Sequence, residues 1–267
     1  MKENIIRGLS GVLYVSILVV SILSSEFAFT TLFLLFGVIC LRELQRLLHL
    51  KSYLGYLLLF TLFYFFSYAR FSPYATQALL LITIFVNLFL VKDLMIVHKI
   101  PLFEKKKYVI IIFYLIASLI FLTLIPSITG DFTPELVIGI FSLIWINDTF
   151  AYLVGKNFGK NKLFERISPK KTIEGFLGGV IFSAVGGYLV FFFTGLLDVP
   201  TWVGMAVILS IFGTLGDLIQ SKFKRQAGVK DSGKLMPGHG GLFDRLDSII
   251  FASPFVYGYL QLLNYVS

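Results

Sequence analysis

The sequence predicts an all-α, polytopic integral membrane protein with about nine transmembrane helices. Three observations lead to this fold class: a very high apolar content, apolar runs that recur from end to end, and cations confined to alternate connections. The 267 residues are 57% hydrophobic and only 14% charged, with a mean hydropathy of +0.86. Soluble domains have about 45–50% apolar and about 25% charged residues, so this chain lacks the polar side chains that a water-exposed surface needs.

Nine apolar runs approach the roughly 20 residues that a helix needs to cross the hydrocarbon core of a bilayer. We predict membrane helices over residues 5–23, 27–41, 53–68, 74–91, 108–126, 136–154, 176–197, 202–219 and 249–266. The second and third runs are short. Those two helices must therefore include flanking polar residues or lie in locally thin bilayer.

Lysine and arginine placement predicts the topology. Of the 23 such residues, 22 lie at the N-terminus or in every second connection, and Arg70 alone lies on the other side. Because cytoplasmic connections carry an excess of these residues, we expect a cytoplasmic N-terminus and an external C-terminus. We therefore expect a multi-pass protein of the cell inner (cytoplasmic) membrane whose basic connections face the cytoplasm. The net charge of +8 reflects that topology, so no nucleic-acid partner is expected.

Polar residues are distributed unevenly along the chain. Residues 1–134 have short connections and helices without buried charge, so we interpret them as N-terminal scaffold helices. Residues 135–267 contain two long, glycine-containing loops and polar helix ends, so we interpret them as the catalytic region. Cys40 is the single cysteine, which excludes an intrachain disulfide.

The first polar cluster begins at Asn147. Asp148, Tyr152 and Gly155 follow at helical spacing, so one helix face presents a carboxylate and a phenol near the cytoplasmic boundary. A carboxylate is costly there unless it is paired or bound to a metal ion. Asp148 therefore either neutralises a neighbouring lysine or takes part in a binding site.

Ser168 and Pro169 predict a helix start, with serine as the N-cap and proline at the first helical position. Lys170 and Lys171 then fall in the first turn, where each cation is unfavourable by roughly 0.3–1 kcal/mol unless an anion binds. We therefore predict a phosphate site between them. The alternative is two solvated lysines that only set the topology.

The second polar cluster begins where the eighth helix leaves the membrane. Asp217, Ser221 and Lys224 share one stripe of this helix. Beyond a glycine-rich turn, Asp244 and Asp247 face the same way on the next helix. Asp217 and Asp244 could therefore bind one or two cations and leave open positions for phosphate oxygens. A plain salt bridge is the alternative for each.

This cluster contains one long motif, which reads Ser221-x-Phe223-Lys224-Arg225-x4-Lys230-Asp231-x-Gly233-x3-Pro237-x-His239-Gly240-Gly241-Leu242-x-Asp244-Arg245-Leu246-Asp247. Together with residues 147–152 and 167–175, the motif resembles the phosphatidate cytidylyltransferases, also called CDP-diacylglycerol synthases. One departure is Met236, where Ile, Leu or Phe is expected. The first half of the chain matches that family only in length, helix number and topology.

The resemblance implies that CTP and the membrane lipid phosphatidic acid become CDP-diacylglycerol and pyrophosphate in phospholipid biosynthesis. It also implies that Mg²⁺, alone or paired with a monovalent cation such as K⁺, is held by Asp217 and Asp244, and it leaves a homodimer open. The expected catalytic residues are charged: Asp217, Lys224, Arg225, Lys230, Asp231, Asp244, Arg245 and Asp247. The expected substrate-binding residues are Asp148, Ser168, Lys170, Lys171, Thr172, Glu174, Ser221, His239, Gly240 and Gly241.

The chemistry of these residue types agrees with that reaction class. A phosphate monoester has a second pKa of about 6, so it is largely dianionic at neutral pH and needs no strong general base. Metal ions and basic side chains can neutralise CTP while the lipid oxygen attacks the α phosphorus in line. His239 lies between glycines and is better interpreted as a ligand-orienting or turn residue than as a base.

Two other functions remain as alternatives. A CTP-dependent lipid kinase of the polyprenol type would use the same metal ion and phosphates. An anion transporter would place charge near the bilayer midplane in two related halves, whereas this charge lies in the loops of one half. A CDP-alcohol phosphotransferase is disfavoured because its Asp-Gly-x2-Ala-Arg type of helix is absent.

Overall fold

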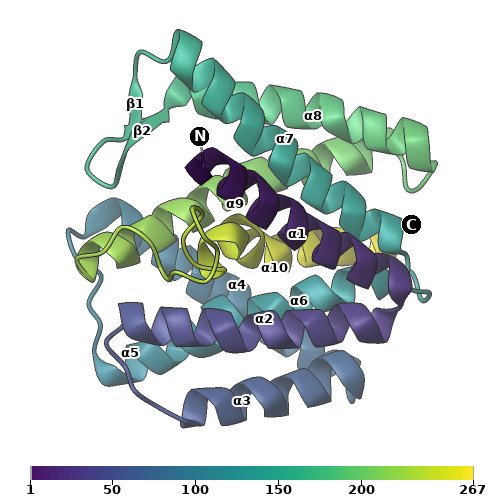
Figure 1. The fold of residues 1–267 in the computed structure, drawn as a ribbon. Coiled ribbons are helices and arrows are strands. Elements are labelled where there is room, and N and C mark those ends of the chain that lie inside the picture. The colour runs from purple at the N-terminus through teal and green to yellow at the C-terminus, as the bar shows by residue number, and fades with distance from the viewer. Residues whose placement is uncertain (1, 267) are drawn as a thin grey trace.

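The computed structural model describes residues 2–266, and the side chains of residues 6–263. The side chain of Lys2, which the charge pattern counts, lies outside this range. Long helices run back and forth between two ends of a bundle, and one short hairpin projects from it (Figure 1). Within the described range, eight helices are long and apolar enough to cross a membrane, and a shorter apolar helix covers Leu54–Tyr68. The all-α polytopic fold is confirmed.

The helices follow the predicted order, and two short strands that were not predicted lie in the second half of the chain. The first half contains α1 (Lys2–Ser24), α2 (Glu26–Leu47), α3 (Leu54–Phe63), η1 (Tyr64–Tyr68), α4 (Pro73–Ile96), α5 (Glu104–Val109), η2 (Ile110–Ala117), α6 (Ser118–Leu124) and η3 (Ile125–Ser127). The second half contains α7 (Pro134–Phe158), β1 (Lys162–Phe164), β2 (Ser168–Thr172), α8 (Ile173–Thr194), α9 (Val199–Gln226) and α10 (Phe243–Val266). Each of the nine predicted runs overlaps one of these helical segments.

The second and third predicted runs, which are short, are extended differently in the structure. Helix α2 reaches 22 residues because it includes the flanking polar residues Glu26 and Arg46, as predicted. Its N-cap is Ser25, whose side chain accepts a hydrogen bond from the Ala28 amide. Helix α3 stays short and continues only as the five-residue π-helix η1. Locally thin bilayer is therefore the alternative that remains for the third run.

The connections gather at two opposite ends of the bundle. At one end, Arg166 of the β1–β2 turn lies 2.9 Å from the Nδ1 atom of His98, in the connection after α4. At the other end, Glu26 contacts Arg70 and accepts a hydrogen bond of 2.7 Å from Ser127. The basic connections thus meet one another, and the exceptional Arg70 lies away from them, as the charge pattern predicts.

The predicted helix start at Ser168 and Pro169 is wrong. Both residues lie in β2, which pairs with β1 in an antiparallel hairpin. This hairpin projects from the basic end of the bundle between α7 and α8 (Figure 1). Lys170 and Lys171 therefore belong to a strand, and the helix-dipole argument for a phosphate between them does not apply.

Helix α8 instead begins one residue after Thr172. The Thr172 hydroxyl accepts a hydrogen bond of 3.1 Å from the Gly175 amide, which is the bond of an N-cap. Glu174 then lies in the first turn, where the helix dipole favours an acid, and both lysines stay outside the helix. Two candidate caps compete here, and the later one satisfies both the capping bond and the dipole.

Close packing of α7 on α8 positions the site. A side chain at Gly179 would lie 2.6 Å from the Asn147 side-chain oxygen, so the helices can approach this closely only with glycine there. Helix α9 packs against both α8 and α10, and α10 also contacts α2, α4 and α6 of the first half. The division at residue 134 stays an interpretation of the sequence.

Candidate active site

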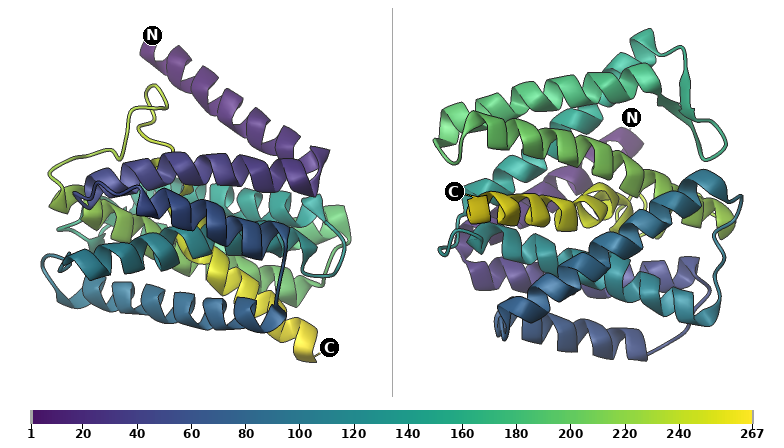
Figure 2. Two further views of the ribbon diagram at one scale, coloured as in Figure 1. Left: turned by 90° about the horizontal axis from the view of Figure 1, so that it is seen from below. Right: turned by 180° about the vertical axis from the view of Figure 1, so that it is seen from behind.

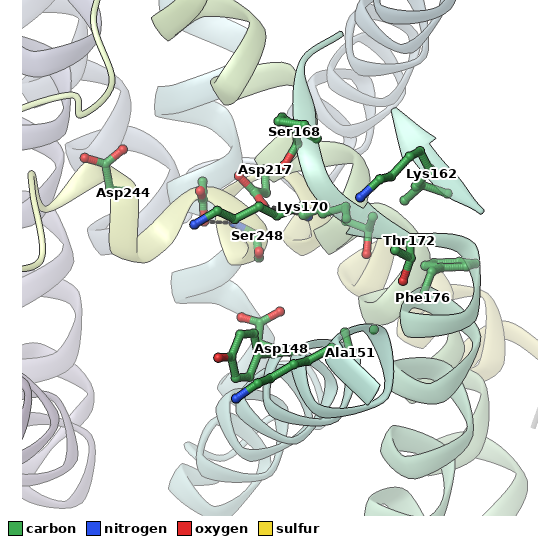
Figure 3. Close-up of a pocket in the computed structure, with 18 of the residues that line it drawn as sticks. Asp148, Ala151, Lys162, Ser168, Lys170, Thr172, Phe176, Asp217, Asp244 and Ser248 are labelled. Atoms are coloured by element: carbon green, nitrogen blue, oxygen red, sulfur yellow. Dashed lines mark hydrogen bonds and ion pairs between the residues drawn. The ribbon is translucent and has the colours of Figure 1, made fainter. Parts of the chain in front are cut away.

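An open cleft of about 690 Å³ lies at the basic end of the bundle (Figure 3). Its walls come from α7, the hairpin, the start of α8, and the facing parts of α9 and α10. Five carboxylates line it: Asp148, Asp217, Asp231, Asp244 and Asp247. Six cations line it as well: Lys156, Lys162, Lys170, Lys171, Lys224 and Arg245. Carboxylates for a metal ion and cations for phosphates therefore meet in one hollow.

Asp217 of α9 is held on both of its carboxylate oxygens. Its Oδ2 atom lies 2.6 Å from the ammonium of Lys171, which comes from β2. Its Oδ1 atom accepts a hydrogen bond of 3.1 Å from Ser221, one helical turn later. The spacing of Asp217 and Ser221 on one face is confirmed, and the partner lysine comes from the other polar cluster.

Asp244, in the first turn of α10, has more partners. Its Oδ1 atom accepts a hydrogen bond of 2.7 Å from Lys224 of α9. Its Oδ2 atom accepts from the amides of Ser232 and Gly241, at 2.8 and 2.9 Å. This carboxylate therefore joins α9, the loop after it, and α10 into one unit.

Two other carboxylates of the cleft lack such partners. Within the described side chains, neither Asp148 nor Asp247 forms an ion pair. Asp148 accepts only a bond of 3.3 Å from Asn147, and Asp247 accepts one from the Ser248 amide at 2.8 Å. The close-up shows Asp148 across the cleft from Asp217 (Figure 3). Among the described side chains, no lysine lies within ion-pair distance of Asp148.

The predicted Mg²⁺ ligands fit a nucleotide-bound ion better than a fully protein-bound one. Among the described residues, no three His, Cys, Asp or Glu side chains cluster tightly enough to hold a metal ion by themselves. Mg²⁺ in nucleotide sites keeps several waters and takes one or two carboxylates plus substrate phosphates. Asp217 and Asp244 line the same cleft and fit that smaller set. A metal ion there would compete with Lys171 and Lys224 for carboxylate oxygens.

Several predicted residues lie outside the cleft. Arg225 donates to the Val229 carbonyl at 3.2 Å and lines none of this hollow. Glu174 accepts bonds from the amides of Lys160 and Asn161, so it fastens the hairpin to α8. Five more predicted residues do not line the cleft: Ser221 of α9, and Lys230, His239, Gly240 and Gly241 of the loop between α9 and α10.

Glu43 is a functional candidate that the sequence reading missed. It lies on α2, in the half interpreted as scaffold, and is only 5% exposed. Its carboxylate accepts hydrogen bonds from the Ser232 hydroxyl at 2.7 Å and from the Leu242 and Phe243 amides at 3.2 and 2.9 Å. The last two amides begin α10, so a residue about 200 positions away caps the helix that carries Asp244. A charged side chain between two apolar runs was the only available signal.

Comparison with known proteins adds to this geometry. The sequence profile of the Cytidylyltransferase family matches residues 5–263, nearly the whole chain. The chain belongs to the cytidylyltransferase family. The chain is also 32% identical over 271 residues to the phosphatidate cytidylyltransferase of Bacillus subtilis (strain 168), a match that covers 99% of both chains.

Other members of the cytidylyltransferase family match more closely over a shorter segment. The phosphatidate cytidylyltransferase of Staphylococcus aureus (strain COL) is 50% identical over 116 residues. That of Staphylococcus haemolyticus (strain JCSC1435) is 50% identical over 115 residues. Each of these two matches covers 43% of this chain and 44% of the relative, so the similarity spans less than half of those proteins.

Proposed function

We propose that the protein transfers the cytidylyl group of CTP to phosphatidic acid, giving CDP-diacylglycerol and pyrophosphate. The observation that carries this proposal is the cleft itself, where five carboxylates and six cations meet at the basic end of a membrane helix bundle. Membership of the cytidylyltransferase family and the end-to-end similarity to a phosphatidate cytidylyltransferase support it.

The chain's own residues would act by neutralising charge and by positioning. Lys162 and Lys170 reach into the cleft from the hairpin, where they can bind the triphosphate of CTP. Lys171 and Lys224 hold carboxylates, and either ammonium can move to a phosphate oxygen when a cation takes its place. The lipid phosphate is largely dianionic at neutral pH, so its oxygen can attack the α phosphorus without a strong general base.

We also infer that Mg²⁺ is the cofactor, with Asp217 and Asp244 as its protein ligands. When bound, Mg²⁺ would offset negative charge on the phosphates and on the departing pyrophosphate. Asp148 and Asp247 lie in the same cleft without an ion pair in the described part of the chain, so they can balance a second cation such as K⁺.

From the positive-inside rule we infer that the basic end of the bundle, and the cleft with it, faces the cytoplasm. CTP would then reach the site directly, and the external C-terminus would follow from nine crossings. The family resemblance further suggests a homodimer, which sedimentation of the detergent-solubilised protein would detect.

The position of the label decides between transfer of the cytidylyl group and transfer of the γ phosphate. With α-labelled CTP, we expect label in the lipid fraction only when phosphatidic acid and Mg²⁺ are both present, and γ label in pyrophosphate. A CTP-dependent lipid kinase would instead put γ label in the lipid and release CDP. Label in the lipid from the γ position would overturn the proposal, and no lipid label of either kind would favour a transporter.

A further inference from the structure

A second hollow, of about 640 Å³, lies beside the cleft and between the N-terminal part of α1 and the loop after α9. Its charged residues are Arg7, Lys230, Lys234, Arg245 and Asp231. Among the described side chains, none of the four cations forms an ion pair. Four cations beside one carboxylate repel one another, so the hollow is best neutralised by a bound anion.

Hydrogen bonds build the wall of this basic hollow. The Nε atom of Arg7 donates to the Gly238 carbonyl at 2.7 Å, and Ser10 lies 2.9 Å from the Nδ1 atom of His239. Gly238 has φ +75°, and a side chain there would lie 2.3 Å from Arg7, so only glycine fits. Arg7 is thus fixed through Nε, and its two other guanidinium nitrogens make no hydrogen bond to the described residues.

His239 fits a hollow of this charge. Burial and the neighbouring cations Arg245 and Arg7 lower the pKa of its imidazole below the ordinary value. A neutral imidazole adds no further positive charge at neutral pH, and its second ring nitrogen remains able to contact a phosphate oxygen.

A third, smaller hollow of about 250 Å³ lies next to the basic hollow, between α1, α7 and α10. Its apolar walls come from three places: Tyr14 and Val15 of α1, Phe141, Ile144 and Trp145 of α7, and Ile249 of α10. It shares His239 and Arg245 with the basic hollow, and Asp148, Asp244 and Asp247 with the cleft. A passage with both apolar and charged walls therefore meets the cleft and the basic hollow.

Helix α1 forms one side of this passage and is loosely attached. It leans away from the rest of the bundle in the view from below (Figure 2). Its outer face carries Leu9, Val12 and Leu13, each more than 60% exposed. An amphipathic ligand could therefore enter between α1 and α7 with its apolar chains in the membrane and its charged group toward Arg7.

We propose that the basic hollow binds the phosphate monoester of the lipid substrate, while its apolar part occupies the passage between α1 and α7. This rests on the proposed function, and it assigns the cleft to CTP. A dianionic phosphate matches the four cations, and acyl chains match the apolar walls. Arg245 lines both charged hollows, so it lies where the two phosphates must meet.

The test separates lipid binding from nucleotide binding. In mixed micelles, Arg7→Ala/Lys234→Ala should raise the KM for phosphatidic acid about tenfold or more, with the KM for CTP and kcat within about twofold. Lys234→Ala alone should raise the lipid KM in the same sense, and Lys234 has no hydrogen bond or ion pair within the described residues. The matched control is Lys99→Ala/Lys105→Ala, which removes two exposed cations from another basic connection and should leave both KM values unchanged.

Equilibrium binding measurements test the lipid site without relying on turnover. Radiolabelled phosphatidic acid should bind the wild-type protein without CTP and bind Arg7→Ala/Lys234→Ala more weakly, while both bind Mg²⁺–CTP equally. Glycerol 3-phosphate, which has the phosphate without acyl chains, should compete weakly, because the passage contributes to affinity. If the lipid binds this way but no cytidylyl group is transferred, the site stands and the proposed reaction falls. A raised KM for CTP alone, or lipid binding equal in all variants, would overturn the assignment.

Discussion

Each predicted metal ligand is held by a lysine from another segment of the chain. Asp217 pairs with Lys171 of β2, and Asp244 pairs with Lys224 of α9. These pairs offset the charge of each carboxylate within the cleft. They also place each ammonium within reach of any phosphate that approaches the same carboxylate. The same carboxylates can therefore form the salt bridges without a metal ion and serve the proposed metal site once the lysines move to a phosphate.

Replacing Asp217 or Asp244 by Asn should lower the rate of cytidylyl transfer at least about 100-fold. A neutral amide cannot replace the negative charge with which a carboxylate holds Mg²⁺ beside a polyphosphate. The initial rate with α-labelled CTP measures this. Asp198→Asn on the same helix is the matched control, since Asp198 caps α9 through the Thr201 amide at 2.9 Å and asparagine caps equally well. Near-normal turnover in both site variants would contradict the metal assignment.

Glu43 acts through the loop that it holds. A side chain at Gly233 would lie 2.2 Å from the Glu43 carboxylate, and one at Gly241 would lie 2.3 Å from it. The loop therefore wraps closely around the carboxylate, which shares the Ser232 hydroxyl with Asp244. Glu43 is a positioning residue for Asp244.

Glu43→Gln should lower activity by about 10–100-fold and raise the Mg²⁺ concentration needed for half-maximal rate, because its NH₂ group would face amides that need an acceptor. The thermal unfolding temperature in detergent should fall as well. Glu104→Gln, which removes an exposed acid from the same end of the bundle, should leave the activity, the Mg²⁺ requirement and the unfolding temperature unchanged. A lower unfolding temperature with an unchanged Mg²⁺ requirement would indicate a structural role only.

The β1–β2 hairpin is the element at which the observed site differs most from the predicted one. Lys170 and Lys171 of β2 both line the cleft, and Lys171 pairs with Asp217 of α9. Had Ser168 begun a helix, both lysines would have lain in its first turn. The dipole of α8 instead starts beyond Thr172, where Glu174 binds the opposite side of the hairpin.

Thr172→Ala should destabilise the folded protein by about 1 kcal/mol, because the amide of Gly175 loses its capping acceptor. Ser168→Ala should leave stability unchanged, since Ser168 caps no helix. Thermal unfolding of the two variants in the same detergent compares them directly. A larger loss for Ser168→Ala would restore the earlier helix start.

At the scale of the whole molecule, the two ends of the bundle differ in charge, because most lysine and arginine residues lie at one end. The hairpin and the connections after α4 and α9 meet at one end, whereas Glu26, Arg70 and Ser127 meet at the other. The cleft and the basic hollow both open at the first end. Under the proposed function, a soluble nucleotide and a membrane lipid would therefore meet at one membrane surface.

Cysteine labelling tests the orientation. In a Cys40→Ala background, a cysteine at Thr129 should react with an impermeant reagent from outside the cell, and one at Glu165 should react only after the membrane is opened. Both positions are exposed and lie at opposite ends of the bundle. The reverse pattern would overturn the cytoplasmic placement of the cleft.

Some features of the site follow from neighbouring residues alone. Asp217 and Ser221 lie one helical turn apart, so their contact was predictable from spacing. The helix start was not, because Ser168 and Thr172 both have the chemistry of an N-cap. The choice between them depends on the pairing of β2 with β1, which capping preferences do not include.

By itself the sequence determined the membrane fold, the nearly complete set of helices and many of the charged residues that line the cleft. Hydropathy, charge placement and helical spacing act over short stretches of chain, so each can be read without knowing the packing. Only the tertiary structure decided that Glu43 caps α10, that Lys171 holds Asp217, and that Arg7 closes a second basic hollow. Those contacts join residues far apart in the chain, and many arrangements of the same helices would satisfy the hydropathy equally well.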